Sequence, residues 1–317
     1  LKRLVFGSYE ILHIHWPERN IGRRNIFLAR LLMIMELALY AFVKLRRKRL
    51  VWTVHNVGCR FPERARFLNV YTALLLRLID GLIFLSESSR DGFISEFPSV
   101  SKISSRVIPH GSYGGEYINE TSKVAARGKL GLKSDERVIL FFGAISRYKN
   151  VEGLVREFRQ IEDPGYRLVI CGRSRDQILI DELKELSRGD ARIRLVVKLV
   201  PPEEAQVYFN ASDVVVLPYG SITNSGVAIL ALTFNRPVLL PNMGSMEELQ
   251  RTVGSNWIKL FDPGRLDKRV LFETVSWASE PRTDTAQSNL PQWNDIAAET
   301  KEFYQQICGQ QLKGYGY

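Results

Sequence analysis

Short apolar runs alternate with longer amphipathic segments along most of the chain. Apolar runs rich in valine, isoleucine and phenylalanine are typical of strands buried on both faces, whereas a 3.6-residue period indicates helices. Strands that alternate with helices predict parallel sheets covered on both faces. The predicted strands are 11–15, 50–55, 81–85, 106–109, 138–142, 166–171, 193–197, 214–218 and 237–240. The predicted helices are 26–43, 65–79, 86–96, 151–161, 176–188, 202–211, 227–234 and 292–306.

The pattern restarts after a polar, glycine-containing stretch at 114–133. A chain of 317 residues is long enough for two domains of ordinary size. We therefore predict an α/β protein with a Rossmann-like parallel-sheet domain at 1–115 and a second one at 116–291. The helix at 292–317 is expected to pack back on the first domain. Ligands of such sheets bind beyond the carboxyl ends of the strands, so a site is expected in the cleft between the domains.

The composition is typical of a soluble globular protein, with 45% hydrophobic and 25% charged residues. Cys59, Cys171 and Cys308 lie far apart and form no CxxC pair, so neither a zinc site nor a disulfide framework is indicated. A reducing compartment fits this cysteine usage best. No cleavable signal pattern follows Leu1, and a segment upstream of this numbering is a further possibility.

Positive charge is concentrated in the first domain. Residues 1–120 hold 18 Lys and Arg against 10 Asp and Glu, so most of the net charge of +10 belongs there. Nine basic residues lie between Arg19 and Arg49, with Glu36 as the one acid. Such a patch attracts anionic lipid or phosphorylated ligands, or simply keeps the surface solvated. It lacks the interleaved aromatic residues that stack on bases, so no nucleic-acid partner is expected.

The apolar segment 26–43 is close to the length of a membrane span. Arg30 and Glu36 in its interior would each cost about 2.5–3.5 kcal/mol on insertion. Its apolar residues occupy most faces, as in a helix packed on a sheet, and we favour that interpretation. Basic residues at its ends can still touch a bilayer surface. We therefore expect a cytoplasmic protein that is peripheral on the inner face of a membrane.

Two loops that follow strands of the second domain combine glycine with basic residues. Gly143 permits close approach of the backbone, and Arg147 and Lys149 add two cations to the same loop. Gly172 and Arg173 repeat the combination after the next strand. Guanidinium and ammonium groups at a sheet edge suit the oxygens of a diphosphate, although basic loop residues are more often just solvated.

The buried helix predicted at 227–234 begins with an unusual number of small or polar residues, including Thr223, Asn224, Ser225 and Gly226. A helix start carries unpaired N–H groups and a partial positive charge, which phosphate oxygens satisfy. The alternative is ordinary N-capping by Asn224 or Ser225, worth about 1 kcal/mol. Capping needs only one such residue, so the pattern favours an anion site.

The second half of the chain resembles the donor-binding half of GT-B glycosyltransferases close to family 4. The resemblance rests on the order of FFGAISRYKN, VICGRS, PPEEAQVYFNASDVVVLPY and SGVAILALTFNRPVLLPNMGSMEE. In the first half, ILHIHWPE, VWTVHN, LIFLSESS and VIPHGSY look like strand ends of the acceptor-side domain. The resemblance implies a nucleotide-sugar donor whose diphosphate contacts Lys149 and the backbone of Ser225 and Gly226. In the same comparison, Glu248 aligns with a glutamate that binds the donor.

The chain departs from this family pattern in two ways. Ile222 and Leu230 replace a pair of glutamates that ordinarily touch the donor's sugar and ribose. Ala144 stands where an arginine usually follows the glycine, and Arg147 is expected to substitute for it. Some relatives that share such a helix start are mannosyltransferase-type enzymes of polysaccharide assembly. We therefore favour GDP-mannose over a UDP-sugar as donor, and a lipid-linked or other saccharide as acceptor.

The strand ends of the first domain supply the acceptor-side candidates. His15, Trp16 and Asn56 are expected to bind the acceptor. Sugar transfer needs the charge of the leaving diphosphate neutralised and, with inversion, a base for the acceptor hydroxyl. We expect His55 to contact the transferred sugar or the acceptor, and Glu18 is the alternative general base. Histidines at strand ends can equally have a structural role, above all His13 and His110.

Motifs of other enzyme classes are missing from the sequence. No Asp-x-Asp occurs, so no metal ion or other cofactor is implied and the basic residues would neutralise the diphosphate. Neither GxGxxG after a strand nor GxxxxGK[ST] is present, which disfavours dinucleotide oxidoreductases and P-loop enzymes. The leading hypothesis is a metal-independent hexosyltransferase. A GT-B nucleotide-sugar epimerase and a GT-B-like binding module without activity remain as alternatives.

Overall fold

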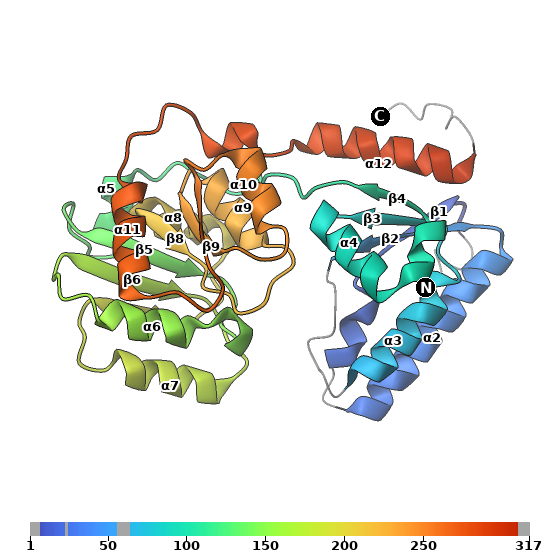
Figure 1. Cartoon of the computed structure of the whole chain (residues 1–317), viewed down its shortest axis with the longest axis horizontal. Helices are drawn as coiled ribbons and strands as arrows, with labels where there is room; N and C mark the ends of the chain where they lie inside the picture. The colour runs from blue at the N-terminus through green and yellow to red at the C-terminus, as the bar shows by residue number, and fades with distance from the viewer. Residues whose placement is uncertain (1–6, 23–24, 56–63, 310–317) are drawn as a thin grey trace. The chain divides into compact units, whose positions relative to one another are not determined.

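The computed structural model describes residues 7–22, 25–55 and 64–309, which form two compact units (Figure 1). The first unit comprises Leu1–His110 and Trp293–Tyr317, and the second comprises Gly111–Gln292. The boundaries expected from the sequence pattern, after residues 115 and 291, differ from these by five residues and one residue. Each unit has its own parallel sheet.

The first unit is a four-stranded parallel sheet in the order β1-β2-β3-β4. Successive strand residues point to opposite faces, so the sheet presents two sets of side chains. Leu50, Trp52 and Val54 pack with the helices on one face, and Val51 packs on the other. Figure 1 shows α2, α3 and α4 on one side of the sheet and α12 on the other. The elements are β1 (Ile11–His15), η1 (Pro17–Gly22), α2 (Ile26–Leu45), β2 (Arg49–Val54), α3 (Ala65–Leu76), β3 (Gly81–Phe84), α4 (Glu87–Glu96), η3 (Pro98–Lys102), β4 (Ser104–Val107) and α12 (Trp293–Cys308).

The last helix, α12, completes the first unit, as the sequence predicts. Phe303 is fully buried and packs against Val51 and Ile83 of the sheet. Gly81 makes this close packing possible, because a Cβ there would lie only 2.8 Å from Cδ1 of Ile307. The end of the chain therefore covers a sheet built by its beginning.

The second unit is a six-stranded parallel sheet in the order β10-β9-β8-β5-β6-β7. Every residue of β8 and β9 is buried, as expected of central strands covered on both faces. The strands are β5 (Arg137–Phe142), β6 (Tyr166–Cys171), β7 (Ile193–Val196), β8 (Val214–Val216), β9 (Val238–Pro241) and β10 (Ile258–Phe261). The helices are α5 (Lys123–Lys129), η4 (Arg147–Lys149), α6 (Val151–Arg159), α7 (Gln177–Ser187), α8 (Pro202–Ala211), α9 (Gly226–Thr233), α10 (Met246–Val253), α11 (Lys268–Ala278) and η5 (Ala286–Asn289).

Several elements differ from the sequence expectation. β4 lies two residues earlier than predicted, because Ser104 and Ser105 pair with β3 despite their weak strand propensity. The polar stretch 114–133 contains α5, whose first turn is capped by Ser122. Sequence reasoning assigned no element to 241–279, where the structure has α10, β10 and α11.

Candidate functional site

The loops after β5 and β6 meet through two glycines. A Cβ on Gly172 would lie 1.8 Å from the carbonyl oxygen of Gly143, so no larger residue fits there without displacing the backbone. Gly143 has a φ of +112°, a conformation that favours glycine, and its N–H donates to the carbonyl of Cys171 at 2.9 Å. Both glycines singled out in the sequence thus shape one surface at the carboxyl ends of adjacent strands.

Lys149 brings a buried cation to this surface. Its side chain extends from η4, and the residue is only 8% exposed. The ammonium lies 5.0 Å from the ring centroid of Tyr219 and 6.0 Å from that of Phe141, within range of cation–π attraction. It also lies 3.5 Å from the position that a Cβ on Gly143 would occupy. The structure therefore directs the Lys149 charge at the first glycine loop.

Arg147 is engaged by carboxylates, which gives no support to the expectation that it substitutes for a missing arginine. Its guanidinium pairs with Glu182 at 2.5 Å, Glu152 at 3.3 Å and Asp176 at 3.4 Å. The hydrogen bond to Glu182 is the main reason why the pKa of Arg147 is raised further. Three carboxylates thus hold this side chain in an ion-pair cluster.

Arg173 is the more available guanidinium. It follows Gly172 directly, and its side chain is exposed. No residue that the structure describes forms a hydrogen bond or ion pair with that side chain. The loop pair therefore carries one buried ammonium and one exposed guanidinium.

The start of α9 has both features that the sequence left open, an N-cap residue and amides without acceptors. Ser225 is the N-cap, and its hydroxyl accepts a hydrogen bond from the N–H of Ala228 at 3.1 Å. The N–H groups of Gly226 and Val227 have no acceptor within the described part of the chain. Val227 also contacts the first glycine loop, since its Cγ2 lies 3.1 Å from the Cβ position of Gly143. Two open amides thus stand beside the loop that Lys149 faces.

A neighbouring loop fixes the approach to α9. The carbonyl oxygen of Thr223 accepts hydrogen bonds from the N–H and hydroxyl of Ser245, at 3.0 and 2.8 Å. Asn224 Oδ1 accepts from the same hydroxyl at 2.9 Å. Gly244, with a φ of +56°, leaves room for this contact, because a Cβ there would lie 2.5 Å from the Ile222 carbonyl oxygen. The contacts of Thr223 and Asn224 are therefore structural, and half-buried Glu248 follows on the first turn of α10.

In the first unit, the histidines of β1 and the end of β2 form a connected cluster. His15 Nδ1 lies 2.8 Å from His55 Nε2, and the Trp16 ring stacks on His55 with centroids 4.0 Å apart. His13 Nε2 lies 2.7 Å from the Thr53 hydroxyl, and Nδ1 of the same ring lies 2.6 Å from the hydroxyl of a tyrosine on α12, Tyr304. The Tyr304 contact joins two ends of the chain, and no local sequence pattern points to it.

This cluster is neutral around pH 7. Burial and, to a smaller extent, the nearby His15 lower the pKa of His13 and of His55 to about 4. Burial also lowers the pKa of His15. An unprotonated imidazole at His55 can accept a proton or a hydrogen bond.

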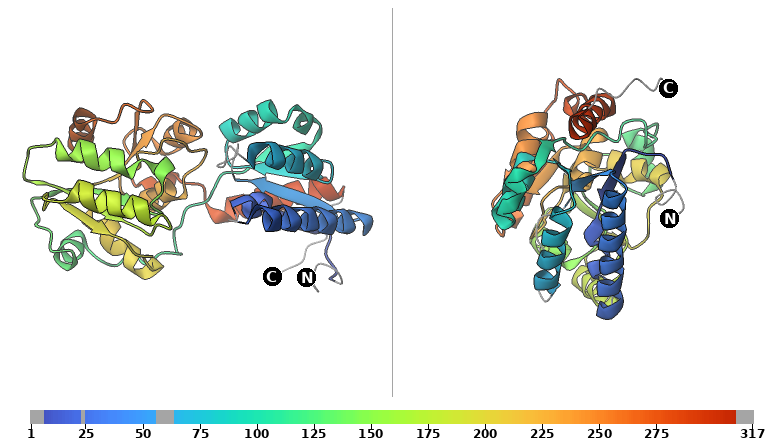
Figure 2. Two further views of the ribbon diagram at one scale, coloured as in Figure 1. Left: turned by 90° about the horizontal axis from the view of Figure 1, so that it is seen from below. Right: turned by 90° about the vertical axis from the view of Figure 1, so that its right-hand side faces the viewer.

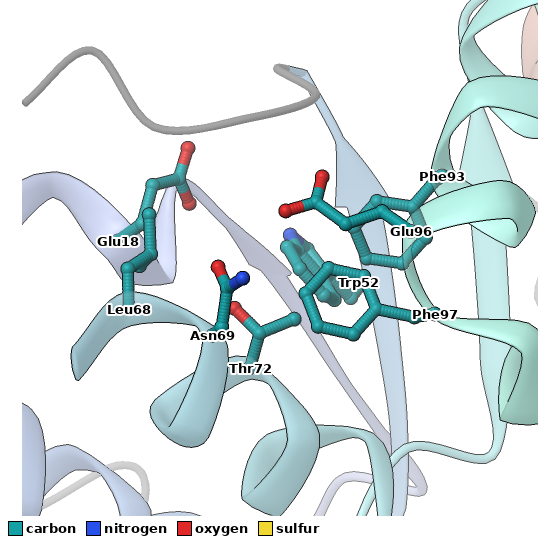
Figure 3. Close-up of a pocket in the computed structure, with 8 residues that line it drawn as sticks. All are labelled: Glu18, Trp52, Leu68, Asn69, Thr72, Phe93, Glu96 and Phe97. Atoms are coloured by element: carbon teal, nitrogen blue, oxygen red, sulfur yellow. The ribbon is translucent and has the colours of Figure 1, made fainter. Parts of the chain in front are cut away.

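Glu18 lies on the other face of the same sheet. It lines a pocket with Trp52 and Phe93, on the side covered by α3 and α4 (Figure 3). His13 and His15 belong with Val51 and Thr53 on the face covered by α12. The two catalytic candidates predicted from the sequence, His55 and Glu18, are therefore not brought together.

Two further residues of the first unit that the sequence analysis considered are His110 and Asn56. The ring of His110 packs edge-on against Trp293 with centroids 5.7 Å apart, which suits a structural role. Asn56 lies outside the described residues, and no position is assigned to it.

Residues 136–269, which hold all the second-unit candidates, match the family described as glycosyl transferases group 1. The chain is 28% identical over 314 residues to a GDP-mannose:glycolipid 4-beta-D-mannosyltransferase from Xanthomonas campestris pv. campestris, covering 95% of this chain and 81% of that protein. A shorter match, 35% over 130 residues, links it to a D-inositol 3-phosphate glycosyltransferase from Mycobacteroides abscessus, covering 39% of this chain and 28% of that protein.

Solved structures share the architecture. Sucrose-phosphate synthase from Thermosynechococcus elongatus superposes with a TM-score of 0.69 at 22% identity, over 96% of this chain and 75% of that one. Anabaena HepE in complex with UDP gives a TM-score of 0.70 at 19% identity, over 86% and 76%. The chain has the GT-B fold, and its residues 136–269 carry a group 1 glycosyltransferase domain. The fold class, the family resemblance and the enzyme class predicted from the sequence are confirmed.

Two tyrosines of this glycosyltransferase were missed by sequence reasoning. Tyr219 provides the ring beneath Lys149, and the hydroxyl of Tyr113 lies 2.9 Å from the Cβ position of Gly226. Tyr219 begins the stretch between β8 and α9, so its place after a buried strand is a usable signal. Tyr113 reaches α9 from far away in sequence and offers none.

Proposed function

We propose that this glycosyltransferase transfers mannose from GDP-mannose to a lipid-linked saccharide at the inner face of a membrane. The observation that carries the proposal is the group of donors around Gly143. There the Lys149 ammonium and two amides without acceptors at the start of α9 surround one glycine loop. Such groups bind the oxygens of a diphosphate, the part common to all nucleotide-sugar donors.

The same groups assist the departure of the nucleotide. In transfer, the bond from the sugar's anomeric carbon to the diphosphate oxygen breaks, and a bond to an acceptor hydroxyl oxygen forms. Negative charge then grows on the leaving diphosphate, where Lys149, the α9 amides and Arg173 are proposed to stabilise it. We propose that these cations and amides neutralise the diphosphate in place of a metal ion, since the sequence contains no Asp-x-Asp.

We assign the proton of the acceptor hydroxyl to the histidine cluster. His55 is neutral at pH 7 because burial lowers the pKa of its imidazole to about 4. It is proposed to contact the transferred sugar or the acceptor, with Trp16, which is 49% exposed, offering an apolar ring face to the saccharide. Glu18 is less suited to this role because it lines a pocket on the opposite face of the sheet.

We infer the identities of donor and acceptor from the names of similar proteins. The Xanthomonas protein similar over 95% of this chain is named for GDP-mannose and a glycolipid. Another relative, from Streptococcus pneumoniae, is an alpha-monoglucosyldiacylglycerol synthase, 25% identical over 244 residues. Both names describe transfer to lipid-borne acceptors. A UDP-sugar is the alternative donor, since Anabaena HepE was solved with UDP-glucose.

Thermal unfolding with GDP, UDP and ADP side by side tests the donor assignment. GDP is expected to stabilise most, by about 2.7 kcal/mol at a hundred times its dissociation constant. Lys149→Met keeps the volume against Tyr219 and Phe141 but removes the charge, and should abolish most of that shift. Arg147→Met is the matched control and should leave it almost unchanged, because three carboxylates already hold Arg147.

Transfer itself is measured with labelled GDP-mannose and UDP-glucose and a membrane lipid extract as acceptor. Label moving from GDP-mannose into the lipid fraction supports the proposal. Equal nucleotide binding by Lys149→Met and wild type would refute the phosphate assignment.

A further inference from the structure

Helix α2 exposes a continuous apolar stripe to solvent. Its buried face is formed by Ala29, Met33, Tyr40 and Val43, which leaves the opposite face uncovered within the described chain. Phe27 is 79% exposed and Leu45, at the other end of the helix, is 82% exposed. The spacing of the exposed apolar residues follows the helical period, so they lie along one face about 30 Å long. This stripe comprises Phe27, Leu31, Ile34, Met35, Ala38, Phe42 and Leu45.

By length and composition α2 is the one helix of the described chain that qualifies as a membrane span. Its connections argue against spanning. It joins β1 to β2, which are adjacent parallel strands, so the helix must run back alongside the sheet. Its one acidic residue, Glu36, faces inward and accepts a hydrogen bond from Asn20 at 2.9 Å. The helix therefore stays packed on the sheet, and only its outer face is available to a partner.

Helix α3 extends the same surface. It contacts α2, and Figures 1 and 2 show the two helices side by side. Val70 is 54% and Leu74 42% exposed, and Arg66 and Arg77 lie on the same face of α3 by helical spacing. The guanidinium of Arg30, on α2, lies over an α3 ring, 5.3 Å from the Phe67 centroid.

The charges around this surface are almost all positive. Arg47, Arg66 and Arg77 are exposed and have no ion-pair partner among the described residues. Lys44 and Arg49 are less available, because both pair with Asp80, at 2.5 and 3.0 Å. Guanidinium groups that border an exposed apolar face complement a layer of anionic headgroups above acyl chains.

We propose that the α2 stripe and the exposed face of α3 lie flat in the surface of a bilayer that contains anionic phospholipid. The apolar side chains enter the boundary between headgroups and acyl chains, and the arginines bind the phosphates. This inference rests on the proposed function, which places a lipid-borne acceptor in the same membrane, and it names the surface that docks there.

Flotation with vesicles tests the proposal without donor or acceptor. The stripe variant carries Leu31→Gln, Ile34→Gln and Met35→Gln. Its matched control carries Ile178→Gln, Leu199→Gln and Phe272→Gln, three apolar residues of the second unit that are also exposed. Vesicles of phosphatidylcholine with phosphatidylglycerol should bind wild type and the control equally. The stripe variant should bind at least about tenfold more weakly.

Charge is tested separately by replacing Arg47, Arg66 and Arg77 with glutamine. This variant should lose about a hundredfold in affinity for the anionic vesicles, and the loss should shrink in high salt. Binding of the stripe variant equal to that of wild type would overturn the proposal. So would a wild-type dimer in light scattering that the stripe variant turns into a monomer while neither floats, since a second copy would then cover the stripe.

Two measurements keep these outcomes interpretable. Circular dichroism shows whether the stripe variant folds; if it does not, Phe27→Gln with Leu45→Gln repeats the test at the two ends of the helix. Flotation that persists without sugar transfer from any nucleotide donor would refute the proposed function alone. Transfer to membrane lipid by a protein that never floats would refute the docking surface alone.

Discussion

The two units build their candidate sites from different materials. The second unit uses mainly its backbone, with two glycines in contact, two amides at the start of α9 and one buried lysine. The first unit uses side chains at strand ends, where His15, His55 and Trp16 contact one another. A backbone site requires a particular chain path, whereas a side-chain cluster requires particular residues.

This difference bears on the two departures from the family pattern that the sequence indicates. The resemblance implies that Ile222 and Leu230 replace two glutamates, whereas the glycine loops and the N-cap of α9 are present. The family match is correspondingly confined to 136–269, within the second unit. The phosphate contacts that we propose for the backbone are thus separable from recognition of the sugar by side chains.

The largest effect is expected from a substitution at Gly172, in the backbone site of the second unit. Gly172→Ala places a Cβ 1.8 Å from the Gly143 carbonyl oxygen, so the free energy of unfolding should fall by more than about 4 kcal/mol and nucleotide binding should be lost. Chemical denaturation measures the first effect and nucleotide titration the second. Gly128→Ala, in α5 with nothing within 4 Å of the added Cβ, is the control and should stabilise by up to about 1 kcal/mol. A Gly172→Ala protein of wild-type stability would show that close contact is dispensable.

The side-chain cluster of the first unit is tested by a substitution at His55. His55→Gln should reduce kcat for transfer about a hundredfold, the usual contribution of a positioned acid or base, and leave the GDP-induced thermal shift unchanged. His110→Gln is the control and should retain activity within about threefold, because that ring packs on Trp293. Steady-state kinetics with labelled donor gives kcat for both variants. Full activity of His55→Gln would remove that residue from the mechanism.

The smallest expected effect is a pH dependence limited to the first unit, which contains all four histidines of the chain. The pKa of His13 and of His55 is about 4 when folded and 6.5 ordinarily, so the unfolded chain binds more protons between these values. Stability that is fully present above about pH 6.5 is therefore lost as the pH falls towards about 4.

Hydrogen exchange resolves this effect by unit. Peptides from β1 and β2 should lose protection as the pH falls from 6.5, after correction for the intrinsic rate, whereas peptides from β5 should not. His13→Gln should flatten the dependence in the first unit. An equal loss of protection in both units would contradict the assignment to the histidines.

The sequence predicted the parallel sheets and most helices because central strands and amphipathic helices carry strong periodic signals. It missed β10, where Lys259 interrupts a short edge strand, and α5, which lies in a polar stretch. Lys149 and Gly172 lie in loops that follow buried strands, as their places in the sequence indicate, and their role in donor binding stays a prediction.

The errors concern side chains whose partners are distant in sequence. Arg147 is held by carboxylates from α6 and α7, and Glu18 points to the face opposite His55. Neither outcome follows from the spacing of residues along the chain. Long-range side-chain packing, and not the path of the backbone, therefore limited the prediction of the site.

The packing of α12 has a consequence for how the protein is made. Phe303 packs over Val51 and Ile83, so this face of the first sheet stays uncovered until α12 has been translated. The later-synthesised middle of the chain can complete its own core first. The first unit can therefore complete its core only after the second unit has been synthesised, and termination before Trp293 yields a product with an apolar sheet face open to aggregation or chaperones.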